Sequence, residues 1–334
     1  MEEAGAAVGC NVGSATRPAV TVVVVAHNQE RFVEQCLDSV AKQIFDDFET
    51  IIIDDCSTDG SVERIEAWLD RTSFPARFLV NDRCRGICAT GNRALRHSRG
   101  DFVSMVSADD FLEPDKLARQ YRFLEQLDTS VAAVFSNARL VDERGRELGL
   151  ALPSGEPPAE GRIFEALIVG NFLTSPTVMA RRAAMQEVGG YDESLFYEDF
   201  DMWLKLAYRY EFRFVPGVLA NYRILPHSLS HDLANEVEMQ ESRARVLLKW
   251  YGTNPTTDAA ILRRAWKHGR RVLAADRVRG PLLLQSVYAN RPTIRRRIGV
   301  ALASMPGSGR ALAGAFDVVD RLRAVVRSAG VSHR

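Results

Sequence analysis

The chain has 334 residues, of which 46 % are hydrophobic and 26 % charged, and its formal net charge is zero. This composition is typical of a globular protein with one large or two modest domains, and no apolar run approaches the roughly 20 residues of a membrane-spanning helix. Five cysteines without CxxC spacing argue against a zinc set and predict reduced thiols in a cytosolic protein.

Charge is distributed unevenly along the chain. From Glu241 onward there are 19 basic and 5 acidic residues, a net charge of +14 that the preceding part balances with −14. A basic surface favours anionic partners such as anionic lipid or a lipid-phosphate acceptor, and it is equally consistent with a solvated helical surface. The first 18 residues predict a disordered leader, because they are small and polar and lack the cationic region of a signal peptide.

Five apolar runs predict short buried strands, at 20–26, 50–54, 77–81, 102–106 and 131–136. Apolar residues at helical spacing predict a helix within 30–43 and another within 61–69. This alternation, with short connections, indicates a right-handed, mostly parallel α/β sheet flanked by helices. A loop at 151–161, rich in proline and glycine, separates the halves 19–150 and 160–230, and the pattern beyond about Ser228 becomes helical and basic.

Two of the predicted strands end in a pair of acids. The segment 54–60 (Asp-Asp-x-Ser-x-Asp-Gly) follows the second strand, and the segment 107–110 (Ser-Ala-Asp-Asp) follows the fourth. Ligands of open parallel sheets bind at the carboxyl ends of the strands, so we expect both acid pairs to face a ligand. Together they indicate a metal-assisted nucleotide site.

With two further elements, these segments resemble a family 2 glycosyltransferase. The further elements are the first strand with its asparagine turn at 22–30 and the Glu-Asp pair before a tryptophan-containing helix at 198–203. The resemblance implies a GT-A fold over 19–230, with a Rossmann-like, mostly parallel sheet flanked by helices. It implies a nucleotide half at 19–150 and an acceptor half at 160–230, followed by a basic helical C-terminal extension over 231–334.

The resemblance implies an inverting, metal-dependent enzyme that moves a sugar from a UDP- or dTDP-sugar to a hydroxyl of a glycan or lipid-linked saccharide. Mn²⁺ or Mg²⁺ would bind Asp109 and Asp110, because hard cations prefer carboxylates, with His227 as a further ligand. Ser107 stands where the family usually has the first acid of its Asp-x-Asp-Asp element. It therefore stays open which oxygen contacts the ribose and which contacts the metal. As an alternative, Asp110 could cap the next helix.

For the nucleotide sugar, the resemblance implies contacts from Ala26, Asn28, Glu30, Asp55, Gly86, Asn92, Arg93, Asp109 and Arg223. Asp55 would accept the N3–H of a uracil or thymine ring, while Asp54 orients the turn. Gly86 would let the backbone approach the diphosphate, and Arg93 would compensate for Gly91, which stands where an arginine is common. Asp55 and Asn28 have the alternative of forming turns, and Arg223 is either a phosphate contact or part of a structural ion pair.

Asp199 matches the family's general base, which must reach the acceptor hydroxyl on the face opposite the leaving group. Glu198 would hold the loop or contact the acceptor, and Asp201 would stabilise the first turn of the helix. The family's usual histidine position is Leu225 in this chain, and His227 lies two residues further on. The role of His227 as a metal ligand therefore stays open.

Two other functions remain as alternatives. A non-catalytic nucleotide-sugar-binding or scaffolding protein would bind the donor without transfer, and a dinucleotide-dependent oxidoreductase would share the strand–helix alternation. Against the oxidoreductase, the chain lacks the GxGxxG motif that such enzymes usually carry after the first strand. The resemblance favours polysaccharide, cell-wall or glycolipid synthesis on the cytoplasmic side of a membrane, with no nucleic acid as partner. Basic amphipathic segments within 290–334 would lie peripherally on an anionic surface of its inner face.

Overall fold

The structure is a computed structural model that describes residues 17–153, 155, 157–196, 199–225, 235–276, 279–280 and 282–284. The chain forms two compact units, which divide between Ser242 and Arg243. The expected leader, apart from its last two residues, lies outside the described residues. So do the basic segments within 290–334 and the candidate residues Glu198 and His227.

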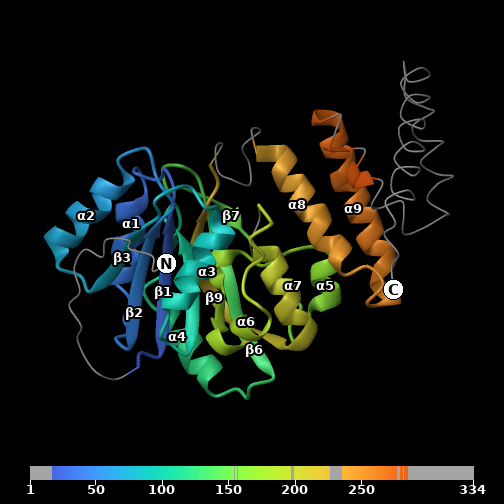
Figure 1. The fold of residues 1–334 in the computed structure, drawn as a ribbon. Coiled ribbons are helices and arrows are strands. Elements are labelled where there is room, and N and C mark those ends of the chain that lie inside the picture. Colours follow the sequence, from blue (N-terminus) through green and yellow to red (C-terminus); the bar gives the residue numbers. More distant parts are fainter. Residues whose placement is uncertain are drawn as a thin grey trace, which may run out of the picture. The chain divides into compact units, whose positions relative to one another are not determined.

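A nine-stranded sheet in the described part of the chain forms the centre of the first unit (Figure 1), and its order is β3-β2-β1-β4-β8-β6-β9-β5, with β7 beside β6. The strands are β1 (Val20–Ala26), β2 (Phe48–Asp54), β3 (Ala76–Val80), β4 (Phe102–Ser107), β5 (Phe111–Leu112), β6 (Val131–Val141), β7 (Glu147–Leu150), β8 (Met179–Arg181) and β9 (Glu211–Arg223). The pairs among β3, β2, β1 and β4 are parallel, as is β6 with β9. The predicted mostly parallel α/β sheet is confirmed.

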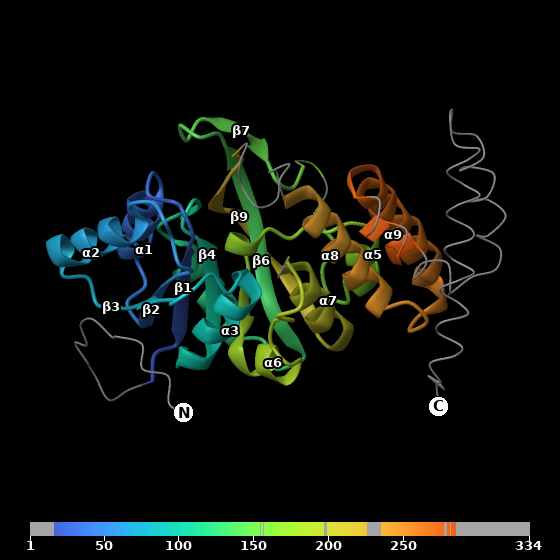
Figure 2. The same ribbon diagram turned by 45° about the horizontal axis from the view of Figure 1, so that its top comes forward.

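The described helices are α1 (Val33–Ala41), α2 (Ser61–Thr72), α3 (Ile87–His97), α4 (Lys116–Glu125), α5 (Phe164–Val169), α6 (Arg182–Glu187), α7 (Asp199–Arg209), α8 (Glu236–Lys249) and α9 (Pro255–Ala275). Helices α1 and α2 lie on one face of the parallel strands and α3 on the other (Figure 2). The reason is that right-handed crossovers lead outward from β1 to β3, and the chain then returns to β4 beside β1. The strand order therefore reverses between β1 and β4, and α/β folds bind ligands at the carboxyl ends of the strands beside such a reversal.

Burial explains why the first strand was predictable. All seven residues of β1 are buried, because helices cover both faces of a parallel sheet. On α1, the buried residues Val33, Cys36, Leu37 and Val40 recur at helical spacing and face the same core. Each fully buried aliphatic side chain of this kind stabilises the fold by about 1.5–3 kcal/mol.

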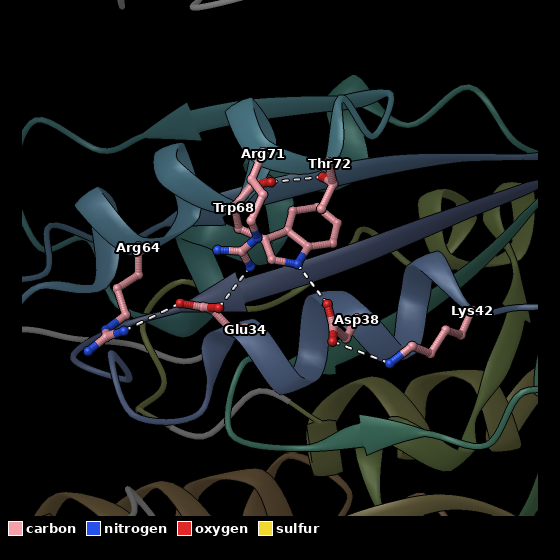
Figure 3. A network of polar contacts seen from close by, with 7 residues as sticks. All are labelled: Glu34, Asp38, Lys42, Arg64, Trp68, Arg71 and Thr72. Atoms are coloured by element: carbon pink, nitrogen blue, oxygen red, sulfur yellow. Dashed lines mark hydrogen bonds and ion pairs between the residues drawn. The ribbon is translucent and has the colours of Figure 1, made fainter.

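Polar contacts join α1 to α2 away from the core (Figure 3). Trp68 Nε1 donates to Asp38 Oδ1 at 2.8 Å, and Arg71 and Arg64 pair with Glu34 at 2.9 and 3.3 Å. The hydrogen bond from Arg71 lowers the pKa of Glu34, and the one from Trp68 lowers the pKa of Asp38. The charged groups are largely exposed, so we expect this network to orient the helices more than it stabilises them.

Strand β9 was not predicted from the sequence. It pairs along β6, but its register with β6 shifts between Phe135 and Asn137, where Pro216 and Gly217 fall on the β9 side. Proline cannot donate to a strand ladder, so it is accommodated where the pairing is irregular. A Pro-Gly pair in sequence indicates a turn, and this signal hides a 13-residue strand.

In the second unit, Pro255 is the first residue of α9. Asn254 caps that helix by accepting from the backbone N–H of Thr256, and proline suits the first turn because its missing N–H would have no helical partner there. Within the described residues, none of the helices combines the length and hydropathy needed to cross a membrane.

The buried lysine Lys116 gives the first testable prediction. It is 0 % exposed, its Nζ donates to Ser104 Oγ at 2.6 Å, and burial lowers its pKa from 10.5 to about 7. Between these two values the unfolded chain binds more protons than the folded chain, so stability rises with pH across this window. Relative to Lys116→Met, we expect the free energy of unfolding of the wild type to rise by about 2–3 kcal/mol from pH 7 to pH 9, measured by urea denaturation. Equal pH dependence in the two proteins would show that Lys116 stays charged in the fold.

Candidate functional site

The loops that follow β1 and β2 are locked together by side chain-to-backbone hydrogen bonds. Asn28 Oδ1 accepts the backbone N–H of Thr58 at 2.8 Å, and Glu30 Oε2 accepts that of Gly60 at 2.7 Å. Asp59 Oδ2 accepts the backbone N–H of Glu30 at 3.1 Å in return. Asn28 has a φ of 54°, a left-handed conformation that asparagine tolerates better than most residues. These contacts favour a loop-forming role for Asn28 and Glu30.

The carboxylate of Asp55 is surrounded by hydrogen-bond donors. Its Oδ1 accepts from Asn81 Nδ2 at 2.6 Å and from the backbone N–H of Arg85 at 2.9 Å, and its Oδ2 accepts the N–H of Gly86 at 2.8 Å. Burial acts to raise the pKa of this carboxyl, but the hydrogen bonds outweigh burial and hold the pKa below its ordinary value. Asp55 is therefore ionised at neutral pH. Asp54 bonds within its own turn instead.

Arg93 positions this carboxylate through Asn81. The guanidinium donates to Asn81 Oδ1 at 2.5 Å, which leaves the amide NH₂ of Asn81 to donate to Asp55. Gly86, with a φ of 81°, precedes α3 in a conformation that glycine adopts readily, and this brings its N–H to the same carboxylate. An anion is favoured at this end of α3, because helix N-termini carry partial positive charge. Ala26 completes the arrangement, since its carbonyl accepts the backbone N–H of Asp55 at 2.8 Å.

Helix α3 also contacts the segment between α6 and α7. Asn92 Nδ2 donates to the carbonyl of Tyr191 at 2.9 Å, and Asn92 Oδ1 accepts the N–H of Tyr191 at 2.8 Å. A Cβ on Gly91 would lie 3.0 Å from the Tyr191 ring, so the ring fills the space beside this glycine. Cys88 Sγ donates to the carbonyl of Leu195 at 3.3 Å. Helix α3 thus holds the segment from Tyr191 to Leu195, between α6 and α7.

Asp109 and Asp110 follow β4, where Asp110 is buried and Asp109 is half-buried. Burial raises the pKa of Asp109, and burial together with the charge of Asp109 raises the pKa of Asp110 well above its ordinary value. Hydrogen bonds from Ser107 and Gln29 partly oppose the shift at Asp109, and Gln29 Nε2 also donates to Ser107 Oγ at 3.0 Å. Two adjacent carboxylates that are costly to ionise together form a donor set that a divalent cation would stabilise.

Arg223, the last residue of β9, lies behind this acid pair and is 2 % exposed. Its backbone N–H donates to Asp110 Oδ1 at 2.8 Å, and its Nε donates to the carbonyl of Asp109 at 2.8 Å. The remaining guanidinium hydrogen bonds go to the carbonyls of Asp142 and Glu143 and to Gln35 Oε1. Four of the five guanidinium donors are thereby directed at protein acceptors, which favours a structural role for Arg223 over contact with a phosphate.

A family model described as glycosyl transferase family 2 matches residues 21–189, just over half of the chain. The chain belongs to glycosyl transferase family 2.

Its relatives in this family include an uncharacterized glycosyltransferase of Methanocaldococcus jannaschii, 27 % identical over 216 residues that cover 64 % of this chain and 73 % of that protein. Chondroitin synthase of Escherichia coli is 26 % identical over 250 residues, which cover 72 % of this chain and 35 % of the synthase. This chain therefore matches about a third of the synthase's length.

Solved structures confirm the GT-A fold. The mannosyltransferase PcManGT from Pyrobaculum calidifontis, in complex with GDP-Man and Mn²⁺, has a TM-score of 0.56 and 18 % identity, with 91 % of this chain and 81 % of that chain covered. Residues 1–349 of S. aureus TarS, in complex with UDP-GlcNAc, have a TM-score of 0.56 and 19 % identity, with 80 % and 79 % covered.

The structure brings the first three family elements together, at the carboxyl ends of β1, β2 and β4. Asp199 of the fourth element begins α7 and is 8 % exposed. Asp201, in the first turn of α7, pairs with Lys205 at 2.8 Å, and Lys205 also donates to the carbonyl of Gly190. The common family arginine has no room at Gly91, because the Tyr191 ring fills that space.

Three residues of this region were not assigned to the site from the sequence. Asn81 follows β3 and donates to Asp55, and His27 Nδ1 donates to the carbonyl of Asp55 at 2.8 Å. Cys84 lies in the same loop as Asn81, with its Sγ 3.6 Å from Asp55 Oδ2. A signal for Asn81 was present, because it follows a third parallel strand at the same edge of the sheet as Asp55.

The two roles of Arg223 predict different results for Arg223→Lys. Lysine keeps the charge but cannot make the forked contacts, so a structural role predicts a loss of about 2–4 kcal/mol in the free energy of unfolding. Arg31→Lys is the matched control, because Arg31 is exposed and pairs with Glu143, and its loss should stay within about 0.5 kcal/mol. Urea denaturation measures both. Unchanged stability with weakened nucleotide binding would instead identify Arg223 as a phosphate contact.

Proposed function

We propose that this chain is an inverting, metal-dependent glycosyltransferase that moves a sugar from a UDP- or dTDP-sugar to a hydroxyl of a glycan or lipid-linked saccharide. The observation that carries the proposal is the placement of Asp55 and of the pair Asp109 and Asp110 after β2 and β4, on either side of β1, at the sheet edge where the strand order reverses. The likeness to chondroitin synthase supports a saccharide acceptor. The complexes of fold neighbours with UDP-GlcNAc or GDP-Man support a nucleotide-sugar donor.

The donor base would lie against Asp55. An ionised carboxylate accepts hydrogen bonds, so it suits the N3–H of uracil or thymine. Its position is fixed by Asn81 and by two backbone N–H groups. Binding of the base therefore loses no free energy in immobilising this side chain. The diphosphate would extend from there toward Asp109, with Gly86 and Arg93 beside its path.

The family implies a Mn²⁺ or Mg²⁺ ion, and the acid pair fits it. Asp109 and Asp110 offer hard oxygen donors, and burial together with mutual repulsion disfavours their ionisation unless a cation is present. When bound, the ion would act as a Lewis acid that stabilises charge on the leaving diphosphate. His227 remains proposed as a further ligand.

The acceptor hydroxyl would lose its proton to Asp199. Asp199 lies at the start of α7, and α3 holds Tyr191 and Leu195 of the segment between α6 and α7. Glu198, next to Asp199, remains proposed to hold this loop or to contact the acceptor. We further propose that synthesis takes place on the cytoplasmic side of a membrane, with the basic C-terminal region peripherally bound to its anionic surface.

A thermal-shift screen tests the donor class. UDP, dTDP, GDP and CMP are each added with and without Mn²⁺, and we expect selective, metal-dependent stabilisation by UDP or dTDP, because ligand that binds only the folded state raises the midpoint. Asp109→Asn should remove the dependence on Mn²⁺. Selective stabilisation by GDP would reassign the base, and no shift with any nucleotide would contradict the proposed function.

Replacing Asp199 with asparagine tests the general base. We expect turnover to fall by about 10²–10⁴-fold while donor binding is retained, because the amide cannot take up the proton. Asp201→Asn is the matched control, since this residue pairs with Lys205 and should affect stability more than turnover. Rates are measured as nucleotide release with acceptor present. Wild-type turnover in Asp199→Asn would remove this residue from the mechanism.

A further inference from the structure

Three side chains with metal-binding atoms meet beside the proposed base pocket. A ring nitrogen of His27, a carboxylate oxygen of Asp55 and Sγ of Cys84 all lie within 4.8 Å of one another. They come from the ends of β1 and β2 and from the loop after β3, so the sheet brings them together from distant parts of the sequence. None of the three belongs to the acid pair that suits Mn²⁺ or Mg²⁺.

The separation of two of these atoms matches a tetrahedral zinc site. Cys84 Sγ lies 3.6 Å from Asp55 Oδ2. With zinc–sulfur and zinc–oxygen bonds of ordinary length and a tetrahedral angle between them, the two ligand atoms would be about 3.5–3.7 Å apart. A cation could thus bind both atoms with little movement of either side chain.

The imidazole of His27 is oriented as a metal ligand usually is. Its Nδ1 lies 2.8 Å from the carbonyl oxygen of Asp55, and because a carbonyl only accepts, Nδ1 carries the proton. This tautomer leaves the lone pair on Nε2, which contacts the Asn28 amide at 3.3 Å. Metal-binding histidines commonly donate their second ring nitrogen to a carbonyl in this way, which fixes both ring and tautomer.

We propose that His27, Asp55 and Cys84 form a binding site for a soft divalent cation such as Zn²⁺. A thiolate and an imidazole select zinc over magnesium or manganese, whereas the oxygen donors of Asp109 and Asp110 select the hard ions. Cys84 is exposed, so the fourth position of the cation is open to water or to an added ligand. As the cation binds, the thiol of Cys84 loses its proton to solvent and a zinc–sulfur bond forms.

The position of this site implies competition with the donor. Asp55 is the carboxylate proposed to read the nucleotide base, so a cation held by Asp55 would block the base. This consequence rests on the proposed function, whereas cation binding itself does not. Zinc would therefore act as an inhibitor, and its removal by a chelator would restore nucleotide binding.

Cobalt spectroscopy on the full chain tests the site without any nucleotide. Co²⁺ is titrated into reduced protein, and we expect one equivalent to give a thiolate-to-cobalt charge-transfer band that Zn²⁺ then removes. Cys84→Ser should abolish the band, and His27→Gln should weaken Co²⁺ binding by at least about tenfold. Cys88→Ser is the matched control for loss of a thiol, because Cys88 is buried and bonded to Leu195. Asp109→Asn, which alters the other proposed metal site, should leave the band unchanged.

The outcomes separate this proposal from the proposed function. A missing band in the wild type, or a band that persists in Cys84→Ser, would overturn the zinc site, provided that circular dichroism shows each variant to be folded. The competition is tested by adding Zn²⁺ to the UDP thermal-shift assay, where a lost nucleotide shift in wild type and a retained shift in Cys84→Ser are expected. If zinc binds but leaves the UDP shift intact, inhibition is excluded and the site stands. If no nucleotide binds at all, the proposed function fails while the cobalt result remains.

Discussion

The placement of two adjacent carboxylates, the half-buried Asp109 and the buried Asp110, is the constraint on which the arrangement of the site depends. Burying such a pair is costly unless hydrogen bonds or opposite charge compensate. Arg223 supplies both, from its backbone N–H and from its guanidinium. In doing so it ties the end of β4 to the end of β9, to the turn after β6 and to α1. The proposed metal site is thus built where the parallel strands β1–β4 meet the β6–β9 pair.

Asp55 likewise organises the other end of this sheet edge. Its carboxylate orders the loop 81–86 by accepting backbone and side-chain donors from it, and that loop leads directly into α3. Helix α3 then holds the loop before α7 through Asn92 and Cys88. A change at Asp55 would therefore affect more than the base contact, since it would loosen α3 and its contacts with Tyr191 and Leu195.

The parts of the site that follow strand ends could be predicted from sequence, because parallel strands bring their carboxyl ends to one edge whatever the detail of packing. Asp55 and Asp109 are of this kind. Strand β9 could not be predicted, since its Pro-Gly pair indicates a turn and only the irregular pairing with β6 accommodates it. Nor could the meeting of His27 with Cys84, because it depends on how the loop 81–86 folds over Asp55. The role given to Asp199 came from family resemblance, not from any pattern of its own.

The hydrogen bonds of the site show that much of the family's sequence pattern encodes folding. Asn28, Glu30 and Asp54 bond to neighbouring loops or within a turn. These contacts place Asp55 and the acid pair at two ends of one sheet edge, with different ligand chemistry at each end. An imidazole and a thiol lie beside Asp55, whereas the acid pair itself supplies carboxylate oxygens. Because hard and soft cations prefer different donors, Mn²⁺ or Mg²⁺ would occupy one end and leave the other to zinc or to a nucleotide base. Whether the enzyme is active or inhibited would then depend on which of the two ligands, the nucleotide base or zinc, binds Asp55 more tightly. No movement of the sheet would be needed.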